Sequence, residues 1–249
     1  MAKESFPAGF LWGTATAAHQ VEGNNINSDF WLLEHTPGAP FVEPSGDACD
    51  QYHRYGDDIA MLAQLGFNAY RFSIEWARIE PEEGHFSLAA LEHYRRVLAA
   101  CHEHKLTPIV TYHHFTSPRW VAAAGGWESA ATAEKFARMC ERATRHFGDL
   151  IGVACTLNEA NLGAYLHLIG ILPERLDPAR LPWLVDAARR AGTEPSRFAP
   201  FLMCDHLKAR DVMLEAHRRS TAAIKSSAAR DFPTGICLAL ADLQAAPGG

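Results

Sequence analysis

Short apolar runs alternate with amphipathic segments along most of the chain. Each run is bounded by Gly, Pro or polar clusters, which is typical of buried β-strands. Five runs are predicted strands: residues 10–16, 69–76, 108–113, 153–157 and 235–240. Between the first two, apolar side chains recur at spacings of three and four, at Tyr52, Tyr55, Ile59, Leu62 and Leu65. Gly66 follows as a stop signal, so this segment is predicted to be an amphipathic helix.

The same helical spacing recurs around residues 88–101, 136–147 and 207–224. Strand and helix therefore alternate, which predicts an α/β fold with parallel strands joined by right-handed crossovers. Either an open doubly wound sheet or a (β/α)8 barrel of the TIM type satisfies this alternation. The third run leads into His113-His114 and the fourth into Asn158-Glu159, and barrel enzymes build their sites at the carboxyl ends of strands. No glycine motif for a dinucleotide or a nucleoside triphosphate follows a strand, so the barrel is favoured.

The number of repeats predicts a barrel that does not close. Five strand–helix repeats make about five-eighths of a (β/α)8 barrel. We therefore expect residues 1–249 to form one partial barrel domain, with unpaired edges on its first and last strands. Residues 161–200 are predicted to be a long loop insertion with short helical pieces, because prolines interrupt them repeatedly. These prolines are Pro173, Pro178, Pro182, Pro195 and Pro200.

The composition limits which classes of partner and which cellular compartment are expected. The 249 residues, 48% of them hydrophobic, are enough to bury a sizeable core. A net charge of −6 with dispersed basic residues argues against nucleic acid or an anionic membrane as a partner. The six cysteines form no CxxC pair and are expected to be small buried residues in a reducing compartment. Without a secretory leader pattern or a run of roughly 20 apolar residues, the expected location is the cytoplasm.

Two strand ends carry side chains that suit sugar chemistry. Cleavage of a glycosidic bond needs a proton donor, and a glutamic acid in a partly apolar pocket can stay protonated near neutral pH. Glu159 fits that role, although a capping or salt-bridged glutamate fits its position equally well. Neighbouring strand residues point to opposite faces, so Asn158 and Glu159 can both meet a ligand only where the strand ends or bulges.

The other strand end offers His113 and His114, either of which could hydrogen-bond a sugar hydroxyl. No HxxxH or HExxH spacing accompanies them, so the sequence predicts neither a metal site nor a cofactor. Near the N-terminus, Trp12, His19, Gln20 and Glu22 combine aromatic, imidazole, amide and carboxylate groups. Such a mixture suits carbohydrates, which present both hydroxyl edges and apolar faces, but most tryptophans in a globular protein belong to the core.

Taken together, six motifs resemble glycoside hydrolase family 1, the β-glucosidase and β-galactosidase family. They are FLWGTATAAHQVEG at 10–23, YHRYGDDI at 52–59, LGFNAYRFSIEW at 65–76, HFTSP at 114–118, GGW at 125–127 and TLNE at 156–159. Their order and spacing also fit the family. The resemblance extends from about residue 6 to residue 249 and is weakest between residues 164 and 197.

The resemblance implies a (β/α)8 barrel that hydrolyses β-glycosides with retention of configuration. Retaining glycosidases use two carboxyl groups roughly 5 Å apart and form a covalent glycosyl-enzyme. Glu159 matches the general acid/base of the family, and Asn158 matches the residue that hydrogen-bonds the sugar 2-hydroxyl. Gln20 and His114 match the positions that hold the other hydroxyls of the non-reducing sugar. Arg71 matches the arginine that supports the nucleophile.

Three departures from the family pattern stand out. Ala160 replaces the proline that usually follows the acid/base, and Phe115 replaces the tryptophan that often follows the binding histidine. Both changes are expected to be tolerated. The third is larger: the Thr/Ser-Glu-Asn-Gly motif that carries the nucleophile on the seventh strand occurs nowhere in the sequence. Glu75, Glu80 and Glu82 are the nearest spare carboxylates, and none is expected to replace it.

Two hypotheses follow for the activity. The first is that the chain is one part of a β-glycosidase, most simply a β-glucosidase acting on non-reducing terminal β-D-glycosyl residues. The missing C-terminal half of the barrel, or a second copy, would then cover the exposed strand edges. The alternative is a non-catalytic half-barrel that self-associates and binds carbohydrate weakly or acts as a scaffold. Activity and oligomeric state separate the two.

Overall fold

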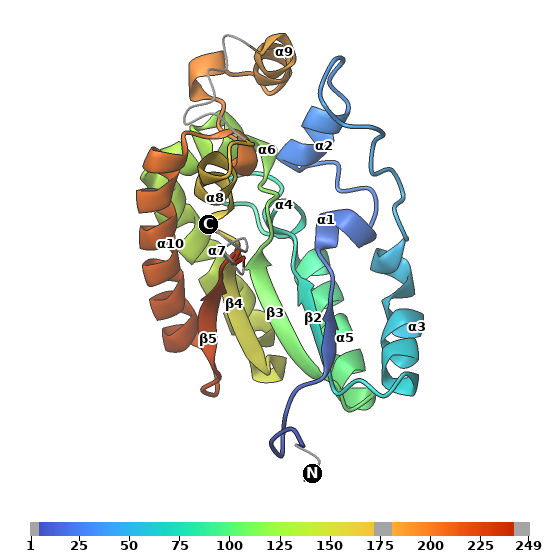
Figure 1. Cartoon of the computed structure of the whole chain (residues 1–249). Helices are drawn as coiled ribbons and strands as arrows, with labels where there is room; N and C mark the ends of the chain where they lie inside the picture. Colours follow the sequence, from blue (N-terminus) through green and yellow to red (C-terminus); the bar gives the residue numbers. More distant parts are fainter. Residues whose placement is uncertain (1–4, 172–180, 242–249) are drawn as a thin grey trace, which may run out of the picture.

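The computed structural model describes residues 5–171 and 181–241, and within them five parallel strands form one sheet (Figure 1). The strands are β1 (Gly13–Ala15), β2 (Ala69–Ser73), β3 (Thr107–His113), β4 (Val153–Asn158) and β5 (Thr234–Cys237). Their order in the sheet is β1-β2-β3-β4-β5, the same as in the chain. A doubly wound sheet would reverse its order at a switch point, so this order is that of a barrel wall. The sheet is therefore the partial (β/α) barrel that the sequence predicts.

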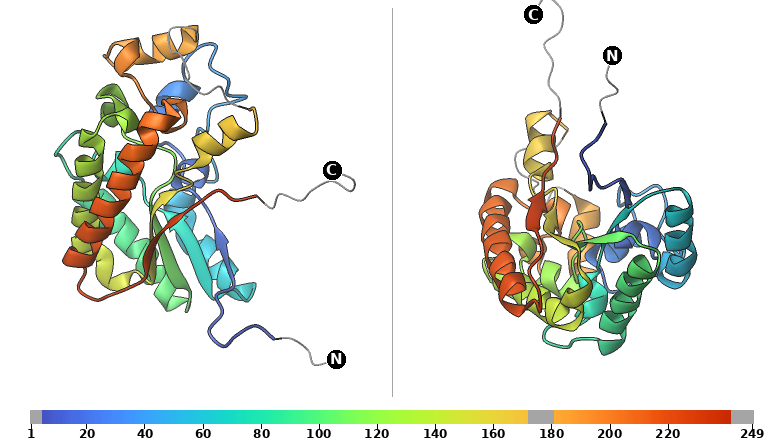
Figure 2. Two further views of the ribbon diagram at one scale, coloured as in Figure 1. Left: turned by 60° about the vertical axis from the view of Figure 1, so that its left-hand side comes forward. Right: turned by 90° about the horizontal axis from the view of Figure 1, so that it is seen from below.

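Helices connect each strand to the next. They are α1 (Ala18–Val21), α2 (Asp29–Glu34), α3 (Gln51–Gln64), α4 (Trp76–Ile79), α5 (Leu88–Glu103), α6 (Arg119–Ala123), α7 (Ala131–Phe147), α8 (Leu162–Leu168), α9 (Pro182–Arg190) and α10 (His206–Ser227). In the right-hand view of Figure 2, α3, α5, α7 and α10 surround the outside of a curved sheet. We call this helix-covered side the convex face and the opposite side the concave face. No helix in the described part of the chain is long and apolar enough to span a membrane.

The main hydrophobic core lies between the convex face and these helices. Alternate strand residues point into it, including Tyr70 and Phe72 of β2 and Val110 and Tyr112 of β3, all of them buried. Phe136 of α7 lies in the same cluster and is fully buried. The phenol of Tyr112 keeps a hydrogen bond inside this core, 2.7 Å from the Thr144 hydroxyl. The amphipathic spacing in the sequence thus corresponds to one continuous helix–sheet interface.

Three strands, β1, β2 and β5, are shorter than the sequence predicts. β1 is confined to Gly13–Ala15, and the rings of Phe6, Phe10 and Trp12 before it form an exposed cluster. β2 ends at Ser73 because a helical turn, α4, starts at Trp76, where the Glu75 side chain accepts a hydrogen bond from the Ala77 amide. β5 ends at Cys237, and the Leu238 and Leu240 side chains beyond it are exposed. In each case the apolar run is longer than the segment that pairs with a neighbouring strand, so the predicted strand was too long.

A second, smaller hydrophobic cluster lies above the carboxyl ends of the strands. Leu33 of α2, Ala122 of α6 and Leu184 of α9 are fully buried in it. Residues 161–200, predicted as a loop insertion, contain α8 and α9, and α9 supplies part of this cluster. Pro173 and Pro178 fall in 172–180, outside the described residues. That these residues form an insertion stays a prediction.

Candidate active site

Arg71, Thr111 and Asn158 form a hydrogen-bonded row on the concave face. The Arg71 guanidinium on β2 donates to the Thr111 hydroxyl on β3 over 2.9 Å and to the Asn158 side-chain oxygen on β4 over 2.6 Å. Asn158 is almost fully buried, whereas Arg71 is half-buried. Thr111 was not among the predicted site residues, although its position two residues before His113 on the same strand places both on one face. The row brings two predicted site residues together across three strands.

Glu159 follows this row directly and sits on a special backbone conformation. Its φ of 49° is left-handed, which is uncommon for any residue other than glycine. Strand β4 ends at Asn158, and its pairing with β5 shifts register between Cys155 and Asn158. The Glu159 amide donates to the Cys237 carbonyl over 2.9 Å. The strand therefore both bulges and ends next to Asn158 and Glu159. This is the condition under which two consecutive strand residues can face the same ligand.

The Glu159 carboxylate has no hydrogen bond or salt bridge to any residue that the structure describes. The residue is half-buried. A carboxylate on a strained backbone, without a partner among the described residues, is available to a ligand. This distinguishes it from a capping or salt-bridged glutamate, the other interpretation of its position.

The two histidines at the end of β3 have different surroundings. His113 is buried, lies 2.9 Å from the Ser117 hydroxyl and packs on the Trp127 ring at a centroid distance of 4.7 Å. His114 is half-buried, and its Nδ1 has no hydrogen-bond partner in the described part of the chain. Burial, with the positive charge of Arg71, lowers the pKa of His114 to about 4. A neutral imidazole with a free ring nitrogen beside the polar row suits a sugar hydroxyl, and His113 is a core residue.

Gln20 lies on α1, which follows β1 at the same end of the sheet, and its side chain is exposed. Its neighbour His19 is buried and lies 2.7 Å from the Glu34 carboxylate. Trp12 does not join them: it precedes β1 and lies with Phe6 and Phe10 at the amino-terminal end of the strand. The expected mixture of aromatic and polar groups is therefore divided between opposite ends of β1.

The spare carboxylates near the site have structural partners. Glu75 accepts a hydrogen bond of 2.7 Å from Thr116, and Glu80 accepts one of 2.8 Å from the Trp76 indole. Glu22, one of the polar groups near the N-terminus that suit a carbohydrate, is instead held by Arg78 at 2.8 Å. Burial raises the pKa of Glu22 to about 7, against the opposing effect of Arg78. Glu82 is exposed in the loop after α4. Glu22, Glu75 and Glu80 are therefore engaged in interactions within the fold.

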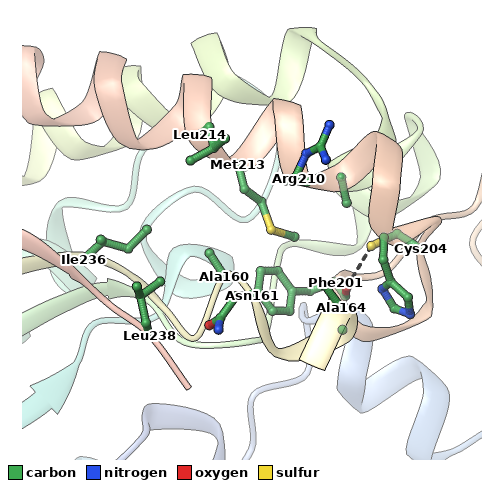
Figure 3. A pocket seen from close by; sticks show the side chains of 13 residues that line it. Ala160, Asn161, Ala164, Phe201, Cys204, Arg210, Met213, Leu214, Ile236 and Leu238 are labelled. Atoms are coloured by element: carbon green, nitrogen blue, oxygen red, sulfur yellow. Dashed lines mark hydrogen bonds between the residues drawn. The ribbon is translucent and has the colours of Figure 1, made fainter. Parts of the chain in front are cut away.

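A cavity of about 160 Å³ lies beside the candidate site, between α8, α10 and the end of β5 (Figure 3). Most of its lining is apolar, with Phe201, Met213 and Ile236 pointing into it. Asn161 is an exception, and its amide is engaged with the backbone of Ala239 at 2.8 and 2.9 Å. Such a lining offers few groups for sugar hydroxyls, so the polar row is the better candidate for sugar binding.

The polar row and Glu159 lie toward the carboxyl ends of parallel strands, which is where (β/α)-barrel enzymes build their active sites. The family model for glycosyl hydrolase family 1 matches residues 2–189. The chain belongs to this family. The described residues contain no group of three or more His, Cys, Asp or Glu side chains placed to hold a metal ion.

Curated relatives and solved structures agree with that assignment. The chain is 41% identical over 167 residues to thermostable beta-glucosidase B of Thermobispora bispora and 39% identical over 176 residues to beta-glucosidase A of Thermotoga maritima. These matches cover 65% and 68% of this chain. The crystal structure of beta-glycosidase BGL167 superposes with a TM-score of 0.90 at 58% identity over 94% of this chain. The partial barrel predicted from the sequence is thereby confirmed.

The chain spans only part of the proteins it resembles. It covers 35% of the Thermobispora bispora enzyme, 40% of the Thermotoga maritima enzyme and 56% of the BGL167 structure. The family 1 β-glucosidase structure from Thermotoga maritima gives a similar result, with a TM-score of 0.76, 31% identity and 48% of that chain covered. Five strands are therefore aligned with about half of a complete barrel structure.

Proposed function

We propose that this chain supplies the acid/base half of a retaining β-glycosidase that acts on non-reducing terminal β-D-glucosyl residues or close analogues. The observation that supports this most directly is the Arg71–Thr111–Asn158 row with the unpartnered Glu159 carboxylate at its end. The names of the relatives support the substrate class, because they are β-glucosidases.

Each group of the row has a role that its surroundings support. Glu159 donates a proton to the leaving oxygen and later takes one from water, as the acid/base of a retaining mechanism. The Asn158 amide, whose oxygen is occupied by Arg71, has its N–H groups left for the sugar 2-hydroxyl. Neutral His114 and exposed Gln20 bind the remaining hydroxyls. Arg71 supplies positive charge for a second carboxylate on the concave face.

That second carboxylate has to come from outside these 249 residues. The family motif for the nucleophile is absent from the sequence, and Glu22, Glu75 and Glu80 are held by structural partners. In the described structure β1 and β5 each pair with one strand only, so both have a free edge. A polypeptide that adds the remaining strands would pair with these edges and place its nucleophile over Arg71.

Complementation tests this proposal. The purified chain, with its intact mass checked, is combined with a polypeptide carrying the remaining strands of a family 1 enzyme, and hydrolysis of aryl β-glucosides is followed. The combination is expected to be active, and Glu159→Gln is expected to lower kcat/KM roughly 100- to 10,000-fold, the usual contribution of a general acid/base. The loss should be smaller for a dinitrophenyl than for a phenyl glucoside, because a good leaving group needs less protonation.

The matched control is Glu82→Gln, which removes the same charge from an exposed loop and is expected to leave hydrolysis unchanged. Equal activity of the Glu159→Gln and unsubstituted chains on both glucosides would refute the assignment of Glu159. Retention of configuration, followed by NMR of the first-formed sugar, tests the two-step mechanism separately.

A second candidate has its own support in the free strand edges and in the exposed Phe6, Phe10 and Trp12 cluster next to β1. Two copies of the chain that cover these surfaces would form a non-catalytic half-barrel dimer. Analytical ultracentrifugation separates the candidates. A stable dimer that stays inactive when the complementing half is added would favour the scaffold over the split enzyme.

A further inference from the structure

Two cysteines that are far apart in sequence lie together on adjacent strands. Cys155 on β4 and Cys237 on β5 are separated by 82 residues, and their Sγ atoms are 3.4 Å apart. Both side chains are half-buried, and all six cysteines of the chain are free thiols. The register shift between β4 and β5 makes the contact possible: Cys155 pairs with Gly235, Cys237 pairs with Asn158, and the extra residue on β4 brings the two thiols together.

The surroundings of the pair favour ionisation of one thiol over the other. The hydrogen bond with Cys155 lowers the pKa of the Cys237 thiol to about 6, and the positive charge of Arg71 acts in the same direction. Partial burial and the nearby Glu159 carboxylate oppose this effect. The pKa of the Cys155 thiol is raised, first by its hydrogen bond with Cys237 and then by burial. Cys237 is thus the better nucleophile and Cys155 the thiol that keeps its proton.

The remaining cysteines lack this combination. Burial raises the pKa of Cys101 and of Cys204 to about 12 each, and burial also raises that of Cys140. Cys49 is exposed, but no second thiol contacts it among the described residues. Among the six cysteines, all of which the structure describes, only the β4–β5 pair combines contact between two sulfur atoms with access from solvent.

We propose that Cys155 and Cys237 form a redox-active dithiol that low-molecular-weight disulfides convert into a disulfide joining β4 to β5. A disulfide bond is about 2 Å long, so the sulfur atoms have to approach by about 1.4 Å from their present separation of 3.4 Å. β5 has only four residues and pairs on one side, so it can make that adjustment.

The reaction is a double thiol–disulfide exchange. The Cys237 thiolate attacks one sulfur of the small disulfide, whose S–S bond breaks and releases one thiolate. Cys155 then loses its proton and attacks the Cys237 sulfur, which displaces the second small thiol. Two protein thiols are oxidised, one small disulfide is reduced to two thiols, and the two protons end on those thiols. The small disulfide is the only oxidant that the exchange requires.

The disulfide would also fix the backbone next to the candidate acid/base. The Cys237 carbonyl accepts the hydrogen bond of the Glu159 amide, so the residue that carries the reactive sulfur also holds Glu159 in place. An effect of oxidation on hydrolysis rests on the proposed function, whereas the thiol chemistry does not. The test therefore reads the thiols directly and uses no glycoside.

Peptide mapping of the oxidised chain tests the proposal. The fully reduced 249-residue protein is incubated under native conditions with oxidised glutathione, the remaining thiols are alkylated, and the digest is analysed by mass spectrometry. A cross-linked peptide pair containing Cys155 and Cys237 is expected, and neither of these two cysteines should be recovered in alkylated form. Exposed Cys49 serves as an internal check that the oxidant reached the protein, because it should take up glutathione.

Single variants separate the attacking thiol from the resolving one. Cys155→Ser is expected to trap glutathione on Cys237, because no thiol remains to displace it. Cys237→Ser is expected to leave Cys155 as an unmodified thiol. Cys101→Ser, in the core, should leave the cross-link unchanged, and circular dichroism verifies the fold of each variant. The proposal is overturned if Cys49 is glutathionylated in the unsubstituted chain while Cys155 and Cys237 are both recovered as alkylated thiols.

Discussion

The two faces of the sheet differ in how completely this chain covers them. On the convex face, Tyr70, Val110 and Tyr112 belong to the main hydrophobic core and are buried to 2% exposure or less. On the concave face, Arg71 and Cys155 remain half-buried, and the side chains there are polar and mutually hydrogen-bonded. The crossover helices of this chain therefore cover the convex face. The polar groups of the concave face are left only partly covered by the described residues.

The two faces are therefore expected to contribute differently to stability and to catalysis. The helices that cover the convex face lie between consecutive strands, so each strand–helix repeat brings its own cover. The concave face can be covered only by strands across the barrel or by a ligand. Substitutions on the convex face should therefore affect mainly folding, and those on the concave face mainly binding and catalysis.

The largest effect on stability is expected from the convex core. Phe136→Ala removes a fully buried ring that packs against Trp76 and Trp127, and it should lower the free energy of unfolding by about 3–5 kcal/mol. Val42→Ala, at a fully exposed side chain, is the control and should change it by less than about 0.5 kcal/mol. Chemical denaturation measures both. Similar losses for the two variants would mean that the core is not packed as described.

A pH-dependent effect of about 2 kcal/mol is expected from His113. Burial lowers its pKa from 6.5 to about 3, so the unfolded chain takes up a proton on this residue as the pH falls below 6.5 and the folded chain does not. The stabilising effect of the neutral ring is therefore complete above pH 6.5 and is progressively lost toward pH 3.

His113→Asn tests this, since the destabilisation it causes should be smaller at pH 5 than at pH 8 by that amount. Denaturant titrations at the two pH values measure the difference. His85→Asn, at an exposed histidine, should leave the pH profile unchanged. A His113→Asn profile parallel to that of the unsubstituted chain would contradict the burial of the His113 ring.

On the concave face, Arg71→Met should cost about 1–2 kcal/mol, less than the core substitution. It leaves the buried Asn158 oxygen without its donor, but Arg71 itself is half-buried and water replaces part of the interaction. Arg210→Met, at an exposed arginine, is the matched control. In the complemented enzyme the same Arg71→Met variant should lose most of its activity. A large loss of stability together with full activity would contradict the inference that concave-face residues act mainly in binding and catalysis.

The smallest effect, about 1 kcal/mol, is expected at the start of α10. The Asp205 side chain accepts hydrogen bonds from the Leu207 and Lys208 amides and caps the helix. Asp205→Ala removes the cap, whereas Asp205→Asn retains an acceptor and should cost clearly less. Thermal unfolding compares the two variants. Equal losses would show that the charge of Asp205, rather than its capping oxygen, stabilises the helix.

Much of the fold could be predicted because it depends on local patterns. The spacing of Tyr55, Ile59 and Leu62 predicted α3, and all five apolar runs contain a strand. The strand ends were less accurate, since an apolar run does not reveal where pairing stops. Leu238 and Leu240 have the composition of a strand but lie beyond the last residue of β5 that pairs with β4.

The sequence by itself determined the alternation of strands and helices, the family motifs and the identity of Glu159 as the acid/base candidate. It also predicted that Asn158 and Glu159 need a strand end or bulge, because side chains alternate along a strand. Only the tertiary structure decided which histidine lies in the core, that Thr111 joins Arg71 to Asn158, and that Cys155 meets Cys237. These contacts join residues 40 to 87 positions apart, and their geometry depends on strand register, which no local pattern encodes.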